Sequence, residues 1–408
     1  MRLLLFEPNH RGHHFVYLAR LLPGMLRLPV KITVGTTPEA LESREYKLSL
    51  IKHEDRLDWW TGCRLPTGHP LKKAARRARE LRAALRDVKP DYVGLIYGDG
   101  LWQILTLLSL VGVRLIPRSM PAEAWLYRGG FAYDDATSLP HRLRRWLFAR
   151  LLRKGIFRTL YLDDELLLRF AESIKGSKTR LVLTPNPIDF LPEKSRADAR
   201  AELGLPADGR LISSSGMVSP WKGMDRLIHN FVAAAGDGRL RDTDRLLLAG
   251  PHSEEIVALL TSDDVKPWVA SGRILSRDEF LSEAQMFAVA AASDLVVAGY
   301  PQHSGRSSII LWAAAAGRPV LAAARGCIGY VVHQENLGAT ADVNDPAAFT
   351  RAMVDALDAP WTPADAERVR AYAHWHRIEN YQHVGATLLR QLTDSPAPGD
   401  AAEAPSAG

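Results

Sequence analysis

The sequence of 408 residues predicts an α/β protein with two Rossmann-like domains that face a cleft. Three observations support this fold class. The chain is longer than one ordinary hydrophobic core organises, since roughly 150 residues per domain gives two or three domains. Short apolar runs alternate with segments of helical period, which is typical of parallel sheets covered by helices on both faces. The alternation stops once, at a proline-rich break, and then restarts.

The first half shows the alternation from its first residues. Strand-length apolar runs fall at 3–6, 30–34, 92–97, 113–116 and 181–183. The segments between them carry apolar residues at helical spacing, at 14–26, 71–88 and 101–110. Strand, helix and strand in this order indicate a parallel sheet. We therefore expect residues 1–190 to form one doubly wound domain.

The break between the halves is the sequence ThrProAsnProIleAsp at 184–189. Its two prolines fit neither a helix interior nor a central strand, so we interpret it as a hinge. Strands are expected again at 211–214, 245–249, 274, 295–298 and 319–322, and helices at 224–235, 254–260, 277–291, 308–316 and 346–357. The second domain then covers residues 191–372.

A last helix is predicted at 373–392, after the second sheet is complete. Nothing in the second sheet requires this helix. The residues that follow, 393–408, are rich in Pro, Ala, Gly and Ser and are expected to be disordered.

Composition excludes several classes of protein. With 47% hydrophobic and 24% charged residues, the chain is close to the globular average. Two cysteines, Cys63 and Cys327, leave neither a disulfide framework nor a cysteine metal cluster. The N-terminus turns polar too early for a signal peptide, and the longest apolar run, at 101–113, is shorter than the roughly 20 residues of a spanning helix. A cytoplasmic location is expected.

Charge is distributed unevenly along the chain. Residues 1–190 contain 32 Lys and Arg against 19 Asp and Glu, and the rest contain 20 against 27. The formal charge of +6 therefore combines +13 with −7. A basic half favours an anionic partner such as phosphate groups, nucleic acid or acidic lipid, with a solvated basic surface as the alternative.

Two loops of the second half have the features of a phosphate site. Residues 214–223, SerSerGlyMetValSerProTrpLysGly, follow a strand and open a helix, and residues 303–308, HisSerGlyArgSerSer, occupy the same kind of position. Helix N-termini favour anions, and arginine pairs with phosphate in bidentate geometry. The predicted ligand residues are Gly216, Lys222, Ser304, Gly305, Arg306, Ser307 and Ser308. The alternatives are that Lys222 is a surface lysine and that Ser307 or Ser308 only caps its own helix.

The loop after the first strand, residues 7–15, crowds polar and titratable groups onto one turn. Gly12 allows the chain to approach a ligand closely. Histidines in such a turn are usually surface or capping residues. Because this turn lies at the mouth of the predicted cleft, we expect Gly12 and His14 to line it and His13 or His14 to contact substrate.

The order of these parts resembles a glycosyltransferase of the GT-B fold, specifically family 4, the glycosyl transferases group 1. The matching segments are 12–14, 185–189, 216–223 and 312–320, and the resemblance extends over residues 1 to about 392. It implies an acceptor domain at 1–190, a donor domain at 191–372 and a C-terminal helix that crosses back to the first domain.

The chain departs from the family pattern at three positions. The family has two glutamates with seven residues between them, and these positions fall on Ser304 and Trp312. The family arginine after the glycine of the Lys-Gly loop is replaced by Met217. Lys222 and Arg306 still supply two cations for a diphosphate.

The resemblance implies transfer of a sugar from a nucleotide-sugar to a glycan, lipid-linked or small-molecule acceptor, with retention of configuration and without a metal or cofactor. The acidic pairs at 134–135 and 163–165 are interpreted as turn and cap residues. If the reaction inverts instead, a base is needed near the acceptor hydroxyl, and His13 and Asp99 are the candidates.

Two other functions compete with this one. Loss of both family glutamates favours a catalytically inactive relative that acts as a binding or assembly partner. A dinucleotide-dependent oxidoreductase is disfavoured because the turn after the first strand has a single glycine instead of Gly-x-Gly-x-x-Gly.

A basic segment at 140–155 has six Lys and Arg and no acidic residue. Its leucines and Trp146 are spaced to form an apolar face, which is either buried against the sheet or laid on an anionic bilayer. Together with the basic helix at 72–89, it predicts weak, salt-sensitive contact with the inner face of a membrane. A nucleic-acid partner is not expected.

Overall fold

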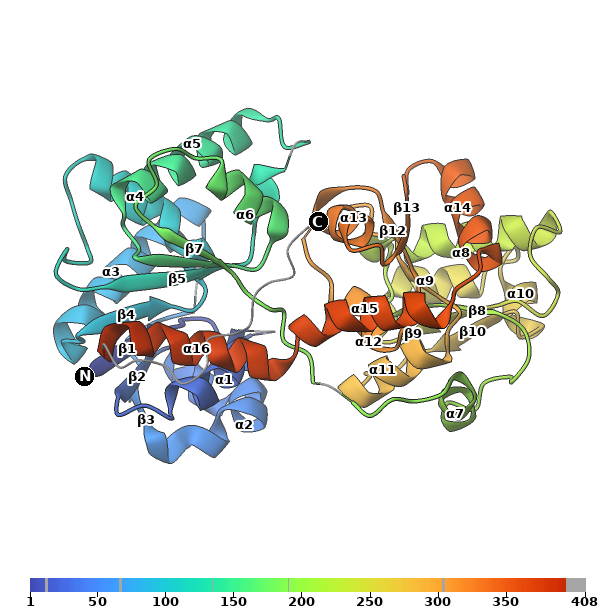
Figure 1. The fold of residues 1–408 in the computed structure, drawn as a ribbon, viewed down its shortest axis with the longest axis horizontal. Helices are drawn as coiled ribbons and strands as arrows, with labels where there is room; N and C mark the ends of the chain where they lie inside the picture. Colours follow the sequence, from blue (N-terminus) through green and yellow to red (C-terminus); the bar gives the residue numbers. More distant parts are fainter. Residues whose placement is uncertain (12–13, 66–67, 134, 190, 303–304, 394–408) are drawn as a thin grey trace. The chain divides into compact units, whose positions relative to one another are not determined.

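A computed structural model describes residues 1–11, 14–65, 68–133, 135–189, 191–302 and 305–393. The chain forms two compact units (Figure 1). Unit 1 combines residues 1–187 with the segment that starts at Ile378, and unit 2 comprises Ile188–Arg377. The first division falls inside the predicted hinge at 184–189. Most of the predicted tail, from residue 394 on, lies outside the described residues.

Unit 1 contains a seven-stranded sheet in the order β3-β2-β1-β4-β5-β6-β7, with parallel pairing throughout. Its strands are β1 (Arg2–Phe6), β2 (Lys31–Gly35), β3 (Leu57–Trp60), β4 (Tyr92–Leu95), β5 (Ala122–Leu126), β6 (Thr159–Leu162) and β7 (Arg180–Leu183). Its helices are α1 (His14–Met25), α2 (Arg44–Ser49), α3 (Pro70–Val88), α4 (Trp102–Leu110), α5 (Leu139–Lys154), α6 (Glu165–Glu172) and α16 (Ile378–Thr393).

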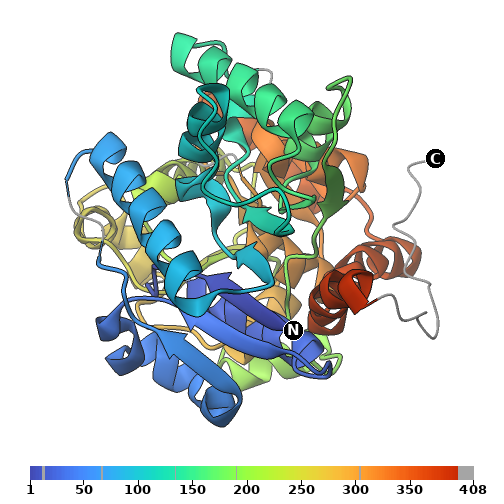
Figure 2. The same ribbon diagram turned by 90° about the vertical axis from the view of Figure 1, so that its left-hand side faces the viewer.

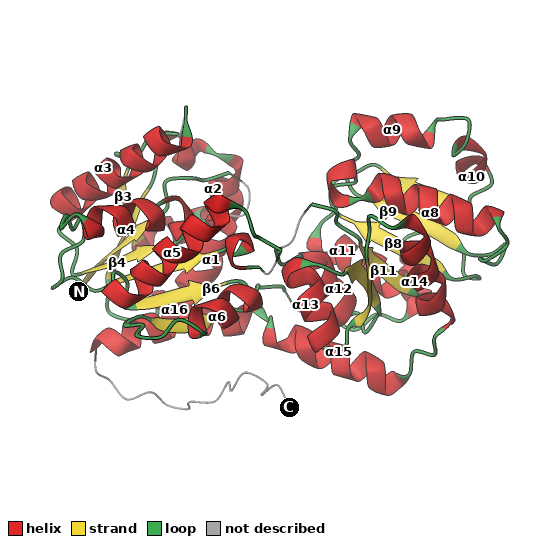
Figure 3. Cartoon of the chain, turned by 90° about the horizontal axis from the view of Figure 1, so that it is seen from above, coloured by secondary structure: helices red, strands yellow, loops and turns green. Residues whose placement is uncertain are grey.

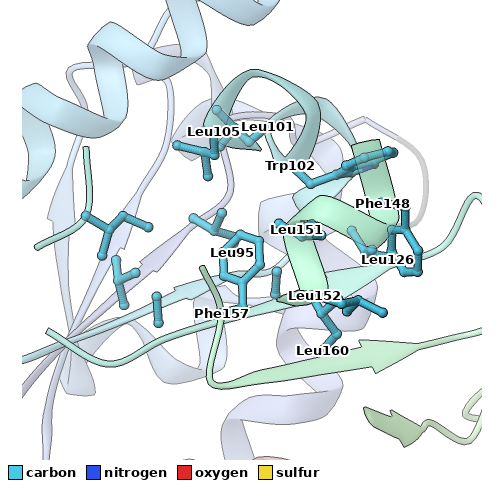
Figure 4. Packing of buried hydrophobic residues seen from close by; sticks show 14 of the residues in the cluster. Leu95, Leu101, Trp102, Leu105, Leu126, Phe148, Leu151, Leu152, Phe157 and Leu160 are labelled. Atoms are coloured by element: carbon cyan, nitrogen blue, oxygen red, sulfur yellow. The ribbon is translucent and has the colours of Figure 1, made fainter. Parts of the chain in front are cut away.

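Both faces of this sheet are buried, as the alternation along β1 illustrates. Leu3 and Leu5 pack under α1, α2 and α16, whereas Leu4 and Phe6 pack under α3, α4, α5 and α6. Figure 4 shows the second of these cores, where side chains of α4 and α5 meet the strands. In Figure 3 the strands of the sheet appear in yellow among the red helices that cover them. Burial on both faces explains why these strands are continuous apolar runs.

Unit 2 contains a six-stranded parallel sheet in the order β10-β9-β8-β11-β12-β13. Its strands are β8 (Leu211–Ser215), β9 (Arg245–Ala249), β10 (Ile274–Arg277), β11 (Leu295–Ala298), β12 (Val320–Ala323) and β13 (Gly338–Ala341). Its helices are α7 (Arg196–Glu202), α8 (Met224–Gly236), α9 (Glu254–Leu260), α10 (Lys266–Ala270), α11 (Glu283–Ala292), α12 (Ser308–Ala315), α13 (Gly326–Gln334), α14 (Pro346–Asp358) and α15 (Pro363–Trp375). The predicted fold class, two Rossmann-like units, is confirmed.

Some predicted elements are wrong. Residues 113–116 form no strand; the fifth strand is β5, and Val113 is exposed after the end of α4. The helix predicted at 277–291 begins only at Glu283, because Arg277 still belongs to β10 and Ser282 caps the helix with a reciprocal capping box. Strands β3, β5, β6 and β13 were not predicted.

The C-terminal helix is the second correction to the predicted boundaries. The helix expected at 373–392 is two helices, because α15 ends at Trp375 and α16 begins at Ile378. The second unit accordingly continues to Arg377 instead of ending at 372. The next helix, α16, belongs to unit 1, as the resemblance implied, and it lies along α1. Figure 2 shows α16 in red at the edge of unit 1.

Glycine sets the distance between α1 and α16. A Cβ atom at Gly24 would lie 2.0 Å from the carbonyl oxygen of Gln382, and one at Gly385 would lie 2.8 Å from that of Leu21. The two helix backbones therefore touch. Beside this contact the buried Tyr381 places its hydroxyl 3.1 Å from that of Tyr127.

Within the described part of the chain, no helix is both long enough and apolar enough to cross a membrane. The same residues bring together no group of three or more His, Cys, Asp and Glu side chains that would hold a metal ion.

We predict that Gly24→Ala destabilises the protein although alanine is the better helix former by about 1 kcal/mol. The added methyl group must push α16 away, and overpacking of this kind costs about 1 to 3 kcal/mol. Gly236→Ala is the matched control, because Gly236 also lies in a helix but no atom lies within 4 Å of its added Cβ. Urea unfolding should show a loss for the first variant and none for the second; equal shifts would contradict the close packing of α1 and α16.

His376 predicts a pH dependence of stability. The side chain follows the end of α15 and is fully buried, against the rings of Tyr372 and Trp375 of that helix. Burial, and then the charge of Arg306, hold the pKa of His376 well below 6.5. In the unfolded chain this histidine binds a proton near pH 6.5, whereas in the folded chain it stays neutral at that pH. The free energy of unfolding therefore falls as the pH drops below about 6.5.

The variant His376→Gln should therefore lose stability at pH 7.5 through packing alone. Its deficit relative to the unmodified protein should shrink by about 1 kcal/mol between pH 6.5 and pH 5.5, because the variant has no proton to exclude. Thermal or urea unfolding at several pH values measures this difference. A deficit that stays constant over that range would show that His376 is protonated in the folded state.

Candidate functional site

Each sheet reverses its strand order beside its first strand. In unit 1 the chain winds from β1 to β2 and β3 in one direction and from β4 to β7 in the other. In unit 2 the reversal lies between β8 and β11. Loops at such a point turn away from each other at the carboxyl ends of the strands and leave a crevice, where ligands of open α/β sheets bind. The loops after β1, β4, β8 and β11 are therefore the candidates.

The loop after β8 begins at Gly216, which has φ +95°, a left-handed conformation that glycine adopts without strain. A Cβ atom there would lie 3.1 Å from Nζ of Lys222, so the glycine also leaves space beside the ammonium group. The same loop ends at Gly223, where a Cβ atom would lie 2.2 Å from the carbonyl oxygen of Gly299. The loops after β8 and β11 are thus in direct backbone contact.

Lys222 differs from the exposed lysine that was the alternative. The residue is half-buried, and burial lowers the pKa of its ammonium group. Its Nζ lies 5.5 Å from the centroid of the Tyr300 ring, on the neighbouring loop. No carboxylate or carbonyl of the described residues hydrogen-bonds with it. A partly desolvated cation without a counter-charge favours binding of an anion.

The loop after β11 carries the second cation. Tyr300 is fully buried, and its hydroxyl lies 3.1 Å from Oγ of Ser307. Ser307 occupies the N-cap position of α12, but its side chain makes no capping hydrogen bond. The serine is therefore not a helix cap in the sense of the alternative prediction. Arg306, half-buried, lies with its guanidinium 5.7 Å from the ring centroid of Trp375. Arg325, after β12, holds this loop by donating to the carbonyl oxygen of Pro301 at 2.8 Å.

The remaining predicted ligand residues of unit 2 differ in position. Gly305 lies in the loop after β11, and Ser308 is the first residue of α12. Ser304 lies outside the described residues. Trp312, which the resemblance aligned with the second family glutamate, is buried within α12. Met217, at the position of the family arginine, is exposed.

In unit 1, the loop after β1 is organised by a buried carboxylate. Glu7 Oε1 lies 2.9 Å from His14 Nδ1 and accepts a hydrogen bond from the backbone N–H of Asn9. The other imidazole nitrogen, Nε2, lies 3.0 Å from the side-chain nitrogen of Asn9, whose oxygen accepts from the N–H of Arg11. An ionised carboxylate only accepts, and the amide nitrogen only donates. This network therefore fits a neutral His14 with its proton on Nδ1.

A series of stacked rings extends from His14. Its imidazole lies 3.9 Å from the ring centroid of Tyr97, after β4, and Tyr97 stacks on Tyr127, after β5, at 4.4 Å. Tyr127 and Tyr17 then reach Tyr381 of α16. The three strand ends at this edge are thereby joined, and the crossover helix supports them.

Asp99 lies in the loop after β4, as predicted, but its carboxylate is engaged. One oxygen accepts from the backbone N–H of Tyr127 and the other from that of Arg128, each at 3.0 Å. Burial raises the pKa of Asp99, although these two hydrogen bonds act in the opposite direction. Asp99 thus connects two loops, and its role as a base stays a prediction. Gly12 and His13 lie outside the described residues.

Several residues of these edges were not predicted as ligands or supports. Tyr127 and Arg325 are separated in the sequence from the motifs they support, and no spacing pattern links Tyr300 to Lys222, although Tyr300 lies just before the 303–308 motif. Glu7 was part of the predicted turn, but only the fold shows that its carboxylate is buried beneath His14.

Comparison with known proteins identifies part of the chain. Residues 209–359 match the family model described as glycosyl transferases group 1. This match lies within the second unit, which we call the glycosyltransferase domain after it. The match covers β8 to α14 and therefore includes both loops that carry Lys222 and Arg306 in the glycosyltransferase domain.

Curated relatives agree with this assignment. D-inositol 3-phosphate glycosyltransferase of Streptomyces scabiei is 31% identical over 179 residues, which is 43% of this chain and 40% of the relative. The enzyme of the same name from Streptomyces avermitilis is 30% identical over 212 residues, or 51% of this chain and 45% of the relative. The matches thus span less than half the length of these relatives.

Solved structures share the fold of the whole chain. Sucrose-phosphate synthase from Thermosynechococcus elongatus superposes with a TM-score of 0.68 and 16% identity, covering 97% of this chain and 99% of that one. The Anabaena protein HepE, in complex with UDP, gives a TM-score of 0.67 with 15% identity and covers 97% and 100%. The glycosyltransferase domain and unit 1 together therefore have the GT-B fold.

We predict that Lys222→Met weakens binding of a nucleoside diphosphate without destabilising the glycosyltransferase domain. Methionine keeps the apolar stem and removes a charge that has no counter-charge in the described residues. The lowered pKa means that holding the charge costs folding free energy, so the free energy of unfolding without ligand should stay equal or rise. Affinity should fall by about 1.5 to 3 kcal/mol, which is roughly 10- to 150-fold.

Arg306→Ala should lower the affinity by a similar factor. Arg239→Ala is the matched control, since Arg239 is an exposed arginine of the same unit. Calorimetric titration with UDP, GDP, ADP and CDP measures affinity, and thermal denaturation measures stability. Unchanged affinity in both Lys222→Met and Arg306→Ala would exclude the loops after β8 and β11 as the diphosphate site.

Proposed function

We propose that this protein transfers a sugar from a nucleotide-sugar to a hydroxyl group of an acceptor. The half-buried ammonium of Lys222 carries the proposal. It lies at the strand-order reversal of the glycosyltransferase domain, without a counter-charge among the described residues. A diphosphate is the ligand that supplies such a charge in a glycosyltransferase.

The donor diphosphate is expected to bind between the loops after β8 and β11. Lys222 and Arg306 neutralise its charge, and the N-terminus of α12 adds backbone N–H groups that the Ser307 side chain does not cap. When the bond between sugar and phosphate breaks, negative charge develops on the leaving diphosphate. Fixed cations and helix N–H groups stabilise that charge without a metal ion. The HepE complexes with UDP and UDP-glucose make UDP-sugars the first donors to test.

The acceptor is expected to bind at the carboxyl edge of unit 1. His14 organises the loop at this edge, because Glu7 and Asn9 occupy both of its ring nitrogens and fix its orientation. Tyr97 and Tyr127 stack on each other and are flanked by His14 and Tyr17, so these rings make the edge rigid for an acceptor instead of offering it a free ring face. The acceptor class remains a glycan, a lipid-linked saccharide or a small molecule, and transfer with retention needs no base from the protein.

One observation favours a second function, nucleotide-sugar binding without transfer. Trp312 is buried in the helix where the family has its ribose-binding glutamate. Its indole gives the ribose hydroxyls no carboxylate acceptor. A chain that binds the diphosphate but orients the sugar poorly would act as a binding or assembly partner.

The test is a screen of nucleotide-sugars in two stages. Thermal stabilisation identifies the donor, because a ligand at 100 times its dissociation constant adds about 2.7 kcal/mol to the free energy of unfolding. Release of the nucleoside diphosphate is then measured with candidate acceptors, and we expect release with the unmodified protein and a strong reduction with Lys222→Met. Stabilisation without any release would support the binding function. No stabilisation by any nucleotide-sugar would contradict both.

A further inference from the structure

Helix α5 has two apolar faces, and only one of them is used inside unit 1. Leu147, Phe148, Leu151 and Leu152 are buried against the sheet and α4, as Figure 4 shows. These residues give the helix its place in the fold. The single apolar face expected from the sequence, which joined Leu143 and Trp146 to these leucines, is therefore divided in two.

The second face, which we call the apolar ridge, consists of Leu139, Leu143 and Trp146. Their intervals of four and three residues keep them on one side of a helix with 3.6 residues per turn. They are exposed by 76%, 55% and 46%. Three large apolar side chains exposed on one helix line form a patch, and exposed apolar patches are a feature of interaction sites.

The neighbouring helix α4 exposes a separate apolar area at its C-terminal end, because parallel strands place that end away from the start of α5. α4 packs beside α5 in the same helical layer (Figure 1). Its outer end exposes Leu107, Leu110 and Val111, and Val113 follows in the next turn. The basic residues Arg114 and Arg118 come directly after it and are exposed.

Positive charge surrounds the apolar ridge. α5 has six Lys and Arg and no acidic residue. Arg150 continues the ridge by a further interval of four, with its guanidinium 5.2 Å from the ring centroid of Trp146. The exposed cations on this helix are Arg142, Arg144, Arg150, Arg153 and Lys154. Arg145 is the exception, because it turns inward and donates to the carbonyl oxygen of Phe131.

The positive charge and the apolar side chains of this surface together indicate which kind of partner it binds. A second copy of this surface would bring cations against cations, and a nucleic acid offers no apolar layer for Leu139 and Leu143. An anionic bilayer offers phosphate headgroups for the arginines, an acyl layer for the leucines and an interface that tryptophan favours. We propose that the apolar ridge and the exposed cations of α5 around it dock unit 1 onto the surface of an anionic membrane.

The expected binding is peripheral and reversible. Only three ridge side chains enter the acyl boundary, and each basic residue near the surface adds roughly a fivefold gain in partitioning. Electrostatic attraction between surface and headgroups weakens as salt shortens the Debye length. This docking does not depend on the proposed sugar transfer, because it is measured without nucleotide-sugar.

The test uses flotation of the full-length protein with two kinds of vesicle, phosphatidylcholine alone and phosphatidylcholine mixed with phosphatidylglycerol. We expect binding to the anionic vesicles at low salt, loss of that binding at high salt, and little binding to the neutral vesicles. Equal binding to both vesicle types, or no binding to anionic vesicles at low salt, would overturn the proposal.

Variants then test the surface itself. The triple variant Leu139→Ser, Leu143→Ser, Trp146→Ser should bind anionic vesicles at least about tenfold more weakly, since each buried CH₂ contributes about 0.8 kcal/mol. Arg142→Glu with Arg150→Glu should weaken binding by at least about 25-fold. The controls are Val257→Ser, an exposed apolar residue of unit 2, and Arg239→Glu with Arg351→Glu, two exposed arginines of that unit.

A cysteine label separates insertion from adsorption. Both native cysteines are buried, so Leu143→Cys offers the accessible thiol for an environment-sensitive fluorophore. Its emission should shift to the blue on anionic vesicles, whereas a label at Val257→Cys should not shift. Variants that bind as well as the unmodified protein, or a dimer in solution that the triple serine variant dissociates, would overturn the proposal.

Discussion

The reversal of strand order beside the first strand of each sheet is the constraint on which the rest of the molecule depends. Crossovers between parallel strands keep one hand, so a chain that adds strands on both sides of its first strand must place helices on opposite faces of the sheet. Two loops then separate at the carboxyl edge. In unit 2 these loops contain Lys222 and Arg306, and in unit 1 they contain His14 and Tyr97. Residues far apart in the sequence become neighbours for this reason.

The two edges use different means to hold their polar groups. In unit 1, His14 has a partner for each ring nitrogen and a ring against its face, so its orientation is fixed before any ligand arrives. In unit 2, Lys222 has an aromatic neighbour but no counter-charge among the described residues. The hydrogen-bonded His14 stabilises the fold. The partly buried charge of Lys222 destabilises it, and a bound anion would offset that cost.

The sequence was sufficient where periodicity and local chemistry agreed. Buried strands such as β1 and β11 are apolar runs, and the two prolines near Ile188 marked the division between the units. The sequence was insufficient where tertiary packing determines which residues are buried. Val113 and Ile116 have strand composition, yet tertiary packing leaves Val113 in solvent. The site likewise contains what spacing indicated, Lys222 and Arg306, but Tyr300, Asn9 and Tyr127 act through contacts that only the fold creates. Burial of Glu7 could not be inferred from a polar turn.

The return of α16 to unit 1 has a consequence for biosynthesis. Unit 2 is continuous in sequence, so all of its strands leave the ribosome before α16 does. Unit 1 lacks the helix that covers α1 until the last part of the chain is made, although its seven strands are synthesised first. Unit 1 can therefore complete its packing only after α16 has been synthesised. Until then the surface of α1 around Gly24 stays uncovered. A completely packed unit 1 is therefore present only in chains in which unit 2 has already been synthesised.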